Sequence, residues 1–138
     1  TDISKVPFLI ESENKAFASE LKDLASTIST IVLFANSKDR FHLHIAAVMV
    51  NNFTNHLYAR AFEFLKDKQL DFNLLHPLIQ ETSNKLNRMS PIDAQTGPTV
   101  RGDEKVELKH LETLNGYSRE IYQLMAASIK SLHRKNEL

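Results

Sequence analysis

Apolar positions are densest in the stretch covering residues 40–67, which contains no glycine or proline. At helical spacing, the following apolar side chains cover most of the circumference of a helical wheel: Ile45, Met49, Phe53, Leu57, Phe64, Ala47, Val50, Ala61 and Leu65. The pattern predicts a long helix that is buried rather than exposed. Its polar side chains form a narrow strip of His44, Asn51 and Asn55, with Asn52 at the edge. Such a strip must be hydrogen-bonded, face a cavity or contact a partner.

Two short apolar runs near the N-terminus, at residues 6–10 and 30–34, predict strands. An amphipathic helix capped by Ser12 is expected between them. This order predicts a βαβ unit with parallel strands and a right-handed crossover. Parallel sheets are normally larger than two strands and covered on both faces. We therefore interpret residues 1–36 as the edge of a larger sheet, and the chain as part of a longer protein.

The pattern after the central helix predicts three further helices. Following a hinge at residues 35–39, the central helix should end near Lys68. Asn73 can cap the next helix, with Pro77 in its first turns, where the missing N–H costs least. The Ser90-Pro91 pair should end that helix. Its leucine stripe, like those of the later helices, is expected to lie in the core.

A region without periodicity at residues 92–102 predicts a loop before the last two helices. Asp103 should begin the first of these, and Asn115-Gly116 should end it in a left-handed turn. Ser118 is expected to cap the last helix, whose C-terminal end carries basic residues that suit the helix dipole.

Composition excludes several classes of function. A length of 138 residues suits one domain with a core of its own. The absence of cysteine excludes disulfides and thiolate metal sites. Seventeen basic and seventeen acidic residues give no field that would attract nucleic acid. No apolar run is long enough for a membrane span, so we expect a cytoplasmic chain that binds neither membrane nor nucleic acid. Three glycines cannot build a glycine-rich phosphate loop.

The loop text QTGPTVRGD is the first candidate for chemistry. Arg101 offers a planar fork of donors for phosphate or carboxylate, and Thr96 offers a hydroxyl. Gly97 and Gly102 allow a close approach of the backbone. A simpler interpretation is that Arg101 pairs with Asp103 and that the glycines only shape a turn. Spacing alone favours this simpler interpretation.

Polar residues of the central helix are the second candidates. His44 is either a hydrogen-bonded core histidine or a proton-transfer group. His42 lies on the opposite side of a regular helix, so the pair cannot chelate one metal, and no metal site is predicted. Asn51, Asn52 and Asn55 either fix the register of a helical bundle or orient a substrate or nicotinamide amide.

No set of nucleophile, base and orienting group is present in the sequence. His110, on the helix after the loop, is expected to lie at the surface or to face the loop. Catalysis by this chain alone is therefore not expected.

Four segments together resemble a known family: VPFLIE, HIAAVMVNNFTNHLY, LLHPLIQET, and QTGPTVRGD before a helix with His110. They resemble the C-terminal portion of bacterial Rossmann-like NADP-dependent oxidoreductases of unassigned substrate. These enzymes are similar to pyrroline-5-carboxylate reductase and to the wider group with a 6-phosphogluconate-dehydrogenase-like helical domain. The resemblance covers nearly all of the chain.

The resemblance implies a mainly α fold. Residues 1–36 would be the βαβ remnant of a Rossmann nucleotide-binding domain that lies mostly before Thr1. Residues 37–138 would be a helical domain of the 6-phosphogluconate dehydrogenase C-terminal type. Such a domain provides the homodimer interface and one wall of the active-site cleft. NADP would be bound mainly by the preceding domain, which agrees with the absence of fingerprint glycines here.

Site residues implied by the resemblance fall in two groups. Catalytic candidates are His44, Asn52 and Asn55. Candidates for binding substrate or cofactor are Thr96, Gly97, Pro98, Arg101, Gly102 and Asp103. Related β-hydroxyacid-type dehydrogenases carry a catalytic lysine on the corresponding helix, whereas residues 41–65 contain none. Their mechanism does not transfer, and His44 is a possible substitute.

We therefore expect the chain to be the dimerisation and substrate-side domain of an NADP-dependent oxidoreductase. Hydride would pass between the nicotinamide and a small carbonyl or imine substrate. The dimer is expected because the helices are more apolar than one layer can cover. The alternative is a non-catalytic helical protein-interaction module, in which the asparagines bind a partner helix.

Overall fold

The computed structural model describes residues 2–134 of the chain. It consists of two compact units, one ending at Ala59 and the other beginning at Arg60, so that the boundary falls within a helix. The predicted division at residue 36 remains a prediction. Among the described residues, no helix has both the length and the apolar character needed to cross a membrane.

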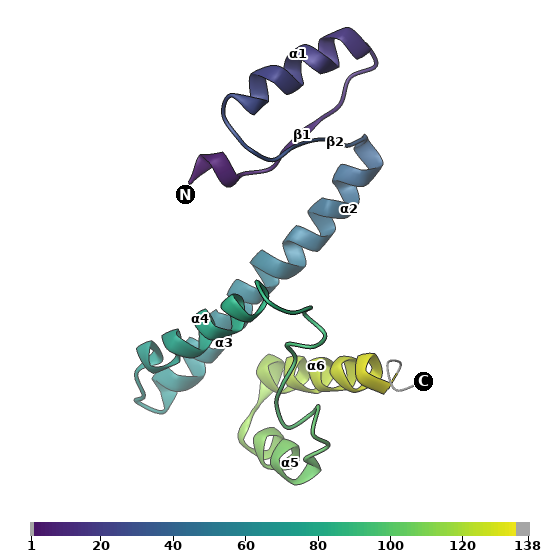
Figure 1. Cartoon of the computed structure of the whole chain (residues 1–138). Coiled ribbons are helices and arrows are strands. Elements are labelled where there is room, and N and C mark those ends of the chain that lie inside the picture. Colours follow the sequence, from purple (N-terminus) through teal and green to yellow (C-terminus); the bar gives the residue numbers. More distant parts are fainter. Residues whose placement is uncertain (1, 135–138) are drawn as a thin grey trace. The chain divides into compact units, whose positions relative to one another are not determined.

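A small βαβ arrangement forms the start of the first unit (Figure 1). Its elements are the 3₁₀ turn η1 (Ile3–Lys5), strand β1 (Phe8–Ile10), helix α1 (Lys15–Ser26) and strand β2 (Val32–Phe34). The strands are parallel, with Phe8 opposite Val32 and Ile10 opposite Phe34. The predicted parallel pair is thus confirmed, although each strand has three residues rather than five.

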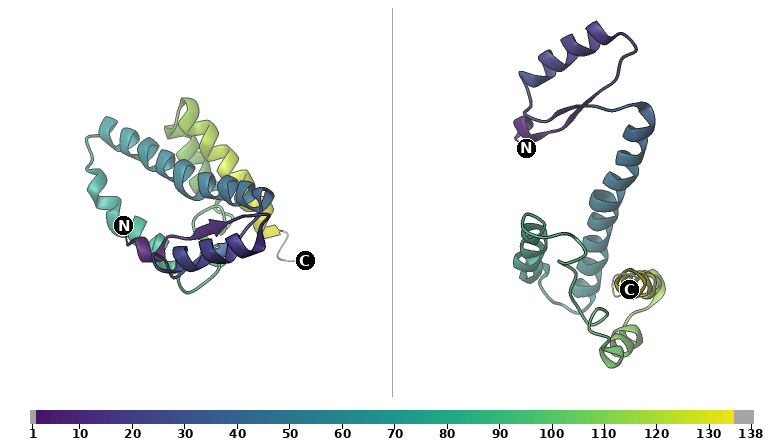
Figure 2. Two further views of the ribbon diagram at one scale, coloured as in Figure 1. Left: turned by 90° about the horizontal axis from the view of Figure 1, so that it is seen from above. Right: turned by 45° about the vertical axis from the view of Figure 1, so that its right-hand side comes forward.

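Helix α1 packs against both strands (Figure 2). Ala18, Ala25 and Ile10 are the buried apolar residues of this contact region. Asn14 caps the helix, accepting hydrogen bonds from the N–H groups of Ala16 and Phe17. The expected cap at Ser12 is wrong: its hydroxyl instead accepts from the Asn14 N–H, in the turn before the helix.

Ser29 is the most buried polar residue of the described chain, with 3% of its surface exposed. Its hydroxyl lies 2.6 Å from the Val6 carbonyl oxygen and accepts from the Ile31 N–H at 3.1 Å. The backbone leading into β1 is thereby joined to the backbone leading into β2. A buried hydroxyl is stable only with such partners.

The central helix runs from Ser37 to Asp67 as three consecutive segments, α2 (Ser37–Ala47), η2 (Val48–Phe53) and α3 (Thr54–Asp67). It begins inside the predicted hinge, because Asn36 caps it by accepting from the Asp39 N–H. Segment η2 is a π-helix, in which hydrogen bonds span five residues. The wheel of a regular helix therefore does not describe the middle of this stretch.

Burial of the central helix is a prediction that the described chain contradicts. No residue of α2, η2 or α3 is buried. Val50 is 75% exposed and Phe53 60% exposed. The apolar pattern correctly identified a helix, but the described residues leave its apolar side chains exposed.

The second unit contains the remaining helices: η3 (Phe72–Leu75), α4 (His76–Lys85), α5 (Glu104–Thr113) and α6 (Gly116–Arg134). Asp71 caps η3, so the expected cap at Asn73 is wrong, while Pro77 does lie in the first turn of α4. Helix α4 ends at Lys85, before the predicted stop at Ser90, and the residues after it form turns.

Helices α5 and α6 pack against each other after the predicted loop. Asp103 caps α5 as expected, accepting from the Val106 N–H at 3.2 Å. Gly116, with φ of +47°, begins α6, and Ser118 lies within this helix instead of capping it. Leucine stripes predicted to be core are largely exposed here, Leu74 and Leu124 among them. The mainly helical class with a small parallel sheet is nevertheless confirmed.

Candidate functional site

The catalytic candidates His44, Asn52 and Asn55 all lie on the central helix of the first unit, in α2, η2 and α3 respectively. All three side chains are exposed. Within residues 2–134, none of them makes a side-chain hydrogen bond. The interpretation of His44 as a satisfied core histidine is therefore wrong. These amides and the imidazole are open to a ligand or a partner, and Asn52 lies in a π-helical turn of the type often found at functional sites.

The loop candidates form a folded turn in the second unit. Gly97 and Gly102 have φ values of +115° and +68°, which side-chain-bearing residues rarely adopt. The Asp103 N–H donates to the Pro98 carbonyl at 2.9 Å, and the Arg101 N–H donates to the Gly97 carbonyl at 3.3 Å. These bonds bring Gly97, Pro98, Arg101 and Asp103 together in one compact loop.

Arg101 is exposed, and it makes no ion pair with Asp103. The Asp103 carboxylate is engaged instead as the cap of α5. The simpler interpretation, that these two side chains only pair with each other, is therefore wrong. The guanidinium is available to an anion, whereas Asp103 has a structural task.

A part-buried ion pair between α5 and α6 was not expected from the sequence. Lys130 Nζ lies 2.7 Å from Glu107 Oε2, and Glu107 is only 8% exposed. The other oxygen, Oε1, is buried without a hydrogen-bond partner among the described residues. The Lys130 hydrogen bond is the main cause that holds the pKa of Glu107 below its ordinary value despite burial.

His110 and Tyr122 form a second polar contact between the same two helices. His110 Nδ1 lies 2.9 Å from the Tyr122 hydroxyl oxygen, and the rings meet edge to face with centroids 5.6 Å apart. Burial, and then the negative charge of Glu107, raise the pKa of Tyr122. His110 is exposed, as expected. Spacing offered a weak signal, since Glu107 and His110 are three residues apart and share a helix face.

A hollow of about 200 Å³ lies between the loop and the C-terminal turns of α6. It is lined by Thr99, Val100, Gly102, Glu104, Lys130, His133 and Arg134. Among the predicted binding residues, only Gly102 is part of this lining. The basic residues of α6, which the sequence suggested only as partners of the helix dipole, line the other side.

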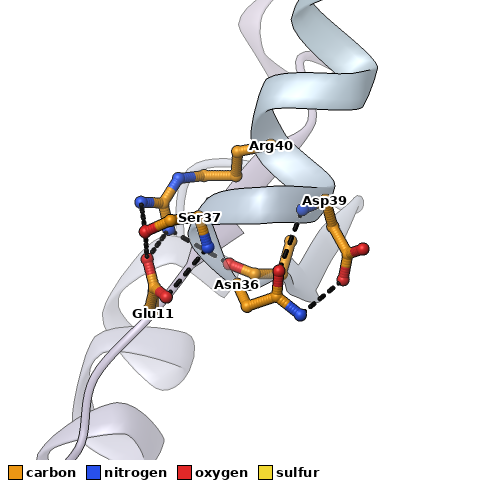
Figure 3. A network of polar contacts seen from close by, with 6 residues as sticks. Glu11, Asn36, Ser37, Asp39 and Arg40 are labelled. Atoms are coloured by element: carbon orange, nitrogen blue, oxygen red, sulfur yellow. Dashed lines mark hydrogen bonds and ion pairs between the residues drawn. The ribbon is translucent and has the colours of Figure 1, made fainter.

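A polar network fixes the start of α2 in the first unit (Figure 3). The backbone N–H and the hydroxyl of Ser37 donate to the Glu11 carboxylate at 2.9 and 2.8 Å, and Arg40 pairs with the same carboxylate. Arg40 also donates to the Ala35 carbonyl at 3.1 Å. The Ser37 hydroxyl bond is the main cause that lowers the pKa of Glu11. The carboxylate that follows β1 thus anchors the central helix.

An open depression of about 420 Å³ adjoins this network at the carboxyl ends of both strands. It is lined by Ile10, Glu11, Ser12, Glu13, Phe34, Ala35, Asn36 and Asp39. In open α/β sheets, ligands bind beyond this edge. Here the depression is broad and acidic, and it contains none of the predicted site residues.

Two solved structures are similar to the chain. One is the crystal structure of BF3122 from Bacteroides fragilis, described as a "putative NADP oxidoreductase", with 43% identity over 95% of this chain and a TM-score of 0.89. The other, the protein TM1727 from Thermotoga maritima, shares the fold at 20% identity over 91% of this chain, with a TM-score of 0.75. The chain spans 51% and 52% of these two proteins.

No curated protein matches the chain. A family model does match it, over residues 6–129, and the description of that family is a domain of unknown function, DUF2520. Since the matched residues include both strands, the central helix and the loop before α5, the chain belongs to the DUF2520 family.

Proposed function

We propose that the chain is the C-terminal, substrate-side part of an NADP-dependent oxidoreductase. Similarity to the Bacteroides fragilis protein is the observation that carries this proposal. In the complete enzyme, hydride would pass between the nicotinamide and a small carbonyl or imine substrate. The helical part would be of the 6-phosphogluconate dehydrogenase C-terminal type, similar to that of pyrroline-5-carboxylate reductase.

A nucleotide-binding domain would precede the described chain in this proposal. Two observations support it. A sheet of two three-residue strands is too small to be stable by itself, and the chain spans about half of its structural relatives. The pyrophosphate of NADP would bind to that domain, because this sequence has no glycine-rich turn of its own.

Within this chain, the exposed groups have distinct proposed roles. The amides of Asn52 and Asn55 would orient the substrate or the nicotinamide carboxamide, and His44 would transfer the proton. Thr96 and the backbone of Gly97 and Pro98 would approach the substrate or cofactor closely. The Arg101 guanidinium, which is exposed and makes no ion pair in the part of the chain that the structure describes, would bind an anionic group. Asp103 would act by holding the loop on α5.

Arg101→Ala in the complete protein tests this assignment. Loss of a charged hydrogen bond is worth about 1.5–3 kcal/mol, so the KM for substrate or cofactor should rise by about tenfold or more. Arg88→Ala, which removes another exposed arginine of the same unit, is the matched control and should leave KM unchanged. Unaltered kinetics in a folded Arg101→Ala protein would remove Arg101 from the site.

We also propose that the central helix forms a homodimer interface. Met49, Val50 and Phe53 are all more than half exposed, and contiguous exposed apolar surface of this kind is rare on monomers. Sedimentation at micromolar concentration should give a dimer, and Val50→Asp should give a folded monomer. A monomeric native protein would contradict this part of the proposal.

The same exposed helix also favours the alternative, a non-catalytic module that binds a partner helix. Adding NADPH to the complete protein distinguishes the two functions. Saturable NADPH binding supports the oxidoreductase. Absence of NADPH binding by a folded complete protein would favour the interaction module.

A further inference from the structure

The hollow between the loop and α6 has a lining that the proposed redox role does not use. On one side are Thr99 and Gly102 of the loop, and on the other are Lys130, His133 and Arg134 of α6. Its volume of about 200 Å³ is below the range of pockets for drug-sized ligands. The space suits a small ion or metabolite rather than a nucleotide.

The basic side chains of this lining lie on one face of α6. Lys130, His133 and Arg134 are separated by three and four residues, so that they are neighbours on the helix surface. Like charges four residues apart destabilise a helix. The helix dipole favours cations in the last turn, which suits His133 and Arg134. The helix dipole does not explain why the side chains of Lys130, His133 and Arg134 line the same hollow.

Only one of these basic side chains is paired with a carboxylate of the described residues. Lys130 pairs with Glu107. Glu104 is the one carboxylate of the lining, and Arg134 makes no ion pair within residues 2–134. Glu104 and Glu107 together match Lys130 and Arg134 in number, so the lining has no excess of charge. The unpaired Arg134 guanidinium is the group of this lining that offers charged hydrogen bonds to an anion.

An unsatisfied polar atom gives the second, independent indication. His133 Nε2 is buried and has no hydrogen-bond partner among the described residues. Such a group costs free energy unless a ligand, an ion or water bonds to it, and few native polar atoms are left in this state. Because His133 lines the hollow, an oxyanion bound there is a candidate to accept a hydrogen bond from this nitrogen after a small side-chain adjustment.

We propose that this hollow binds a small anion, the carboxylate or phosphate group of a small molecule, through Arg134 and His133. Lys130, held in place by Glu107, adds positive charge. The site belongs to the second unit alone. It does not depend on NADP or on the proposed oxidoreductase activity.

Titration of the isotope-labelled complete protein, followed by NMR amide shifts, tests the proposal. Inorganic phosphate and acetate are added separately, with chloride keeping the ionic strength constant. Saturable shifts are expected at residues 99–102 and 130–134. Saturation by phosphate alone identifies a site for phosphate groups, saturation by acetate alone identifies a site for carboxylates, and saturation by both identifies a site that accepts either oxyanion. Shifts that grow linearly with both anions would overturn the proposal.

Variants then separate a built site from diffuse charge. Arg134→Gln should weaken binding by about tenfold, and Arg134→Lys should recover part of the loss. Lys105→Gln removes an exposed cation of α5 outside the lining and is the matched control. Arg134 is exposed, so these variants should keep the native spectrum. Equal weakening by Lys105→Gln, or native binding by Arg134→Gln, would overturn the proposal.

Discussion

Polar side chains are used in opposite ways on the central helix and between α5 and α6. On the central helix, His44, Asn52 and Asn55 are exposed and make no hydrogen bonds within the described residues. Between α5 and α6, Glu107 is buried against Lys130, and His110 contacts Tyr122. The polar groups of the first region are therefore open to water and available to a ligand or a partner. The second region is already held by its own polar contacts.

The contrast shows that the sequence alone does not tell whether a polar group on an apolar helix is exposed to water or covered and hydrogen-bonded. An unpaired amide costs little while water reaches it, and the same amide needs partners once it is covered. The exposed amides of the central helix are therefore tolerated without protein partners in the described chain. The polar groups covered between α5 and α6, in contrast, need their hydrogen-bond partners within the folded unit. Four experiments can test this difference between the two regions.

Lys130→Met should have the largest effect. It leaves the buried Glu107 carboxylate without its donor, and a buried acceptor without a partner costs about 1–3 kcal/mol. The free energy of unfolding in urea should fall by that amount. Lys105→Met, at an exposed lysine of α5, should change it by less than about 0.5 kcal/mol. Equal effects of the two variants would remove the contrast between the regions.

Asp103→Ala should have the next largest effect. The variant removes the cap of α5, which is worth about 1 kcal/mol, and loosens the end of the loop. Thermal unfolding should show the loss. Asp103→Asn keeps a capping oxygen and should be near native. If Asp103→Asn is as damaging as Asp103→Ala, the negative charge matters rather than the cap.

Acid titration should reveal a smaller contribution from Glu107. Its pKa is lower in the folded chain than the ordinary value of 4.5. The unfolded chain therefore binds the proton first, and the contribution to stability is complete above pH 4.5 and is lost as the pH falls through the folded pKa. Glu107→Gln should flatten the stability profile in that window. Glu11→Gln, whose carboxylate also has a lowered pKa, tests the first unit in the same way. A profile unchanged by Glu107→Gln would contradict this assignment.

Asn52→Ala and Asn55→Ala should have the smallest effect on stability. Both side chains are exposed and make no hydrogen bond within residues 2–134, so each change should stay within about 0.5 kcal/mol. The measurement is urea unfolding at submicromolar concentration, where self-association is minimised. A loss well beyond that limit would mean that the amides are hydrogen-bonded in the folded chain, and the contrast would be reversed.

Much of the fold could be predicted because it depends on neighbours in sequence. The apolar runs that include β1 and β2, the cap at Asp103 and the turn at Gly116 follow from local pattern and local hydrogen bonds. Cap positions were less certain, because Asn14 and Ser12 offer similar oxygens two residues apart. The π-helical turn at Val48–Phe53 could not be seen, because no residue type encodes it.

The candidate site was predicted only in part, because sequence patterns report on neighbours in the chain and not on distant residues that meet in the fold. The loop and the exposed Arg101 could be identified from unusual residue types placed close together. Glu107 and Lys130 are 23 positions apart in the sequence. The hollow beside them likewise combines residues of the loop with residues near the end of α6. Nothing in the spacing of Glu107 and Lys130 distinguishes them from other charges on the same helices.

The sequence by itself determined the order of the elements, the parallel strand pair, the helical remainder and the loop before α5, because backbone hydrogen bonds and apolar periodicity act over short distances. Only the tertiary structure decided which charges are buried, which polar atoms lack partners and which apolar helix is left uncovered. Those outcomes depend on which helix faces meet, and a helix face is completed by residues far away in the chain.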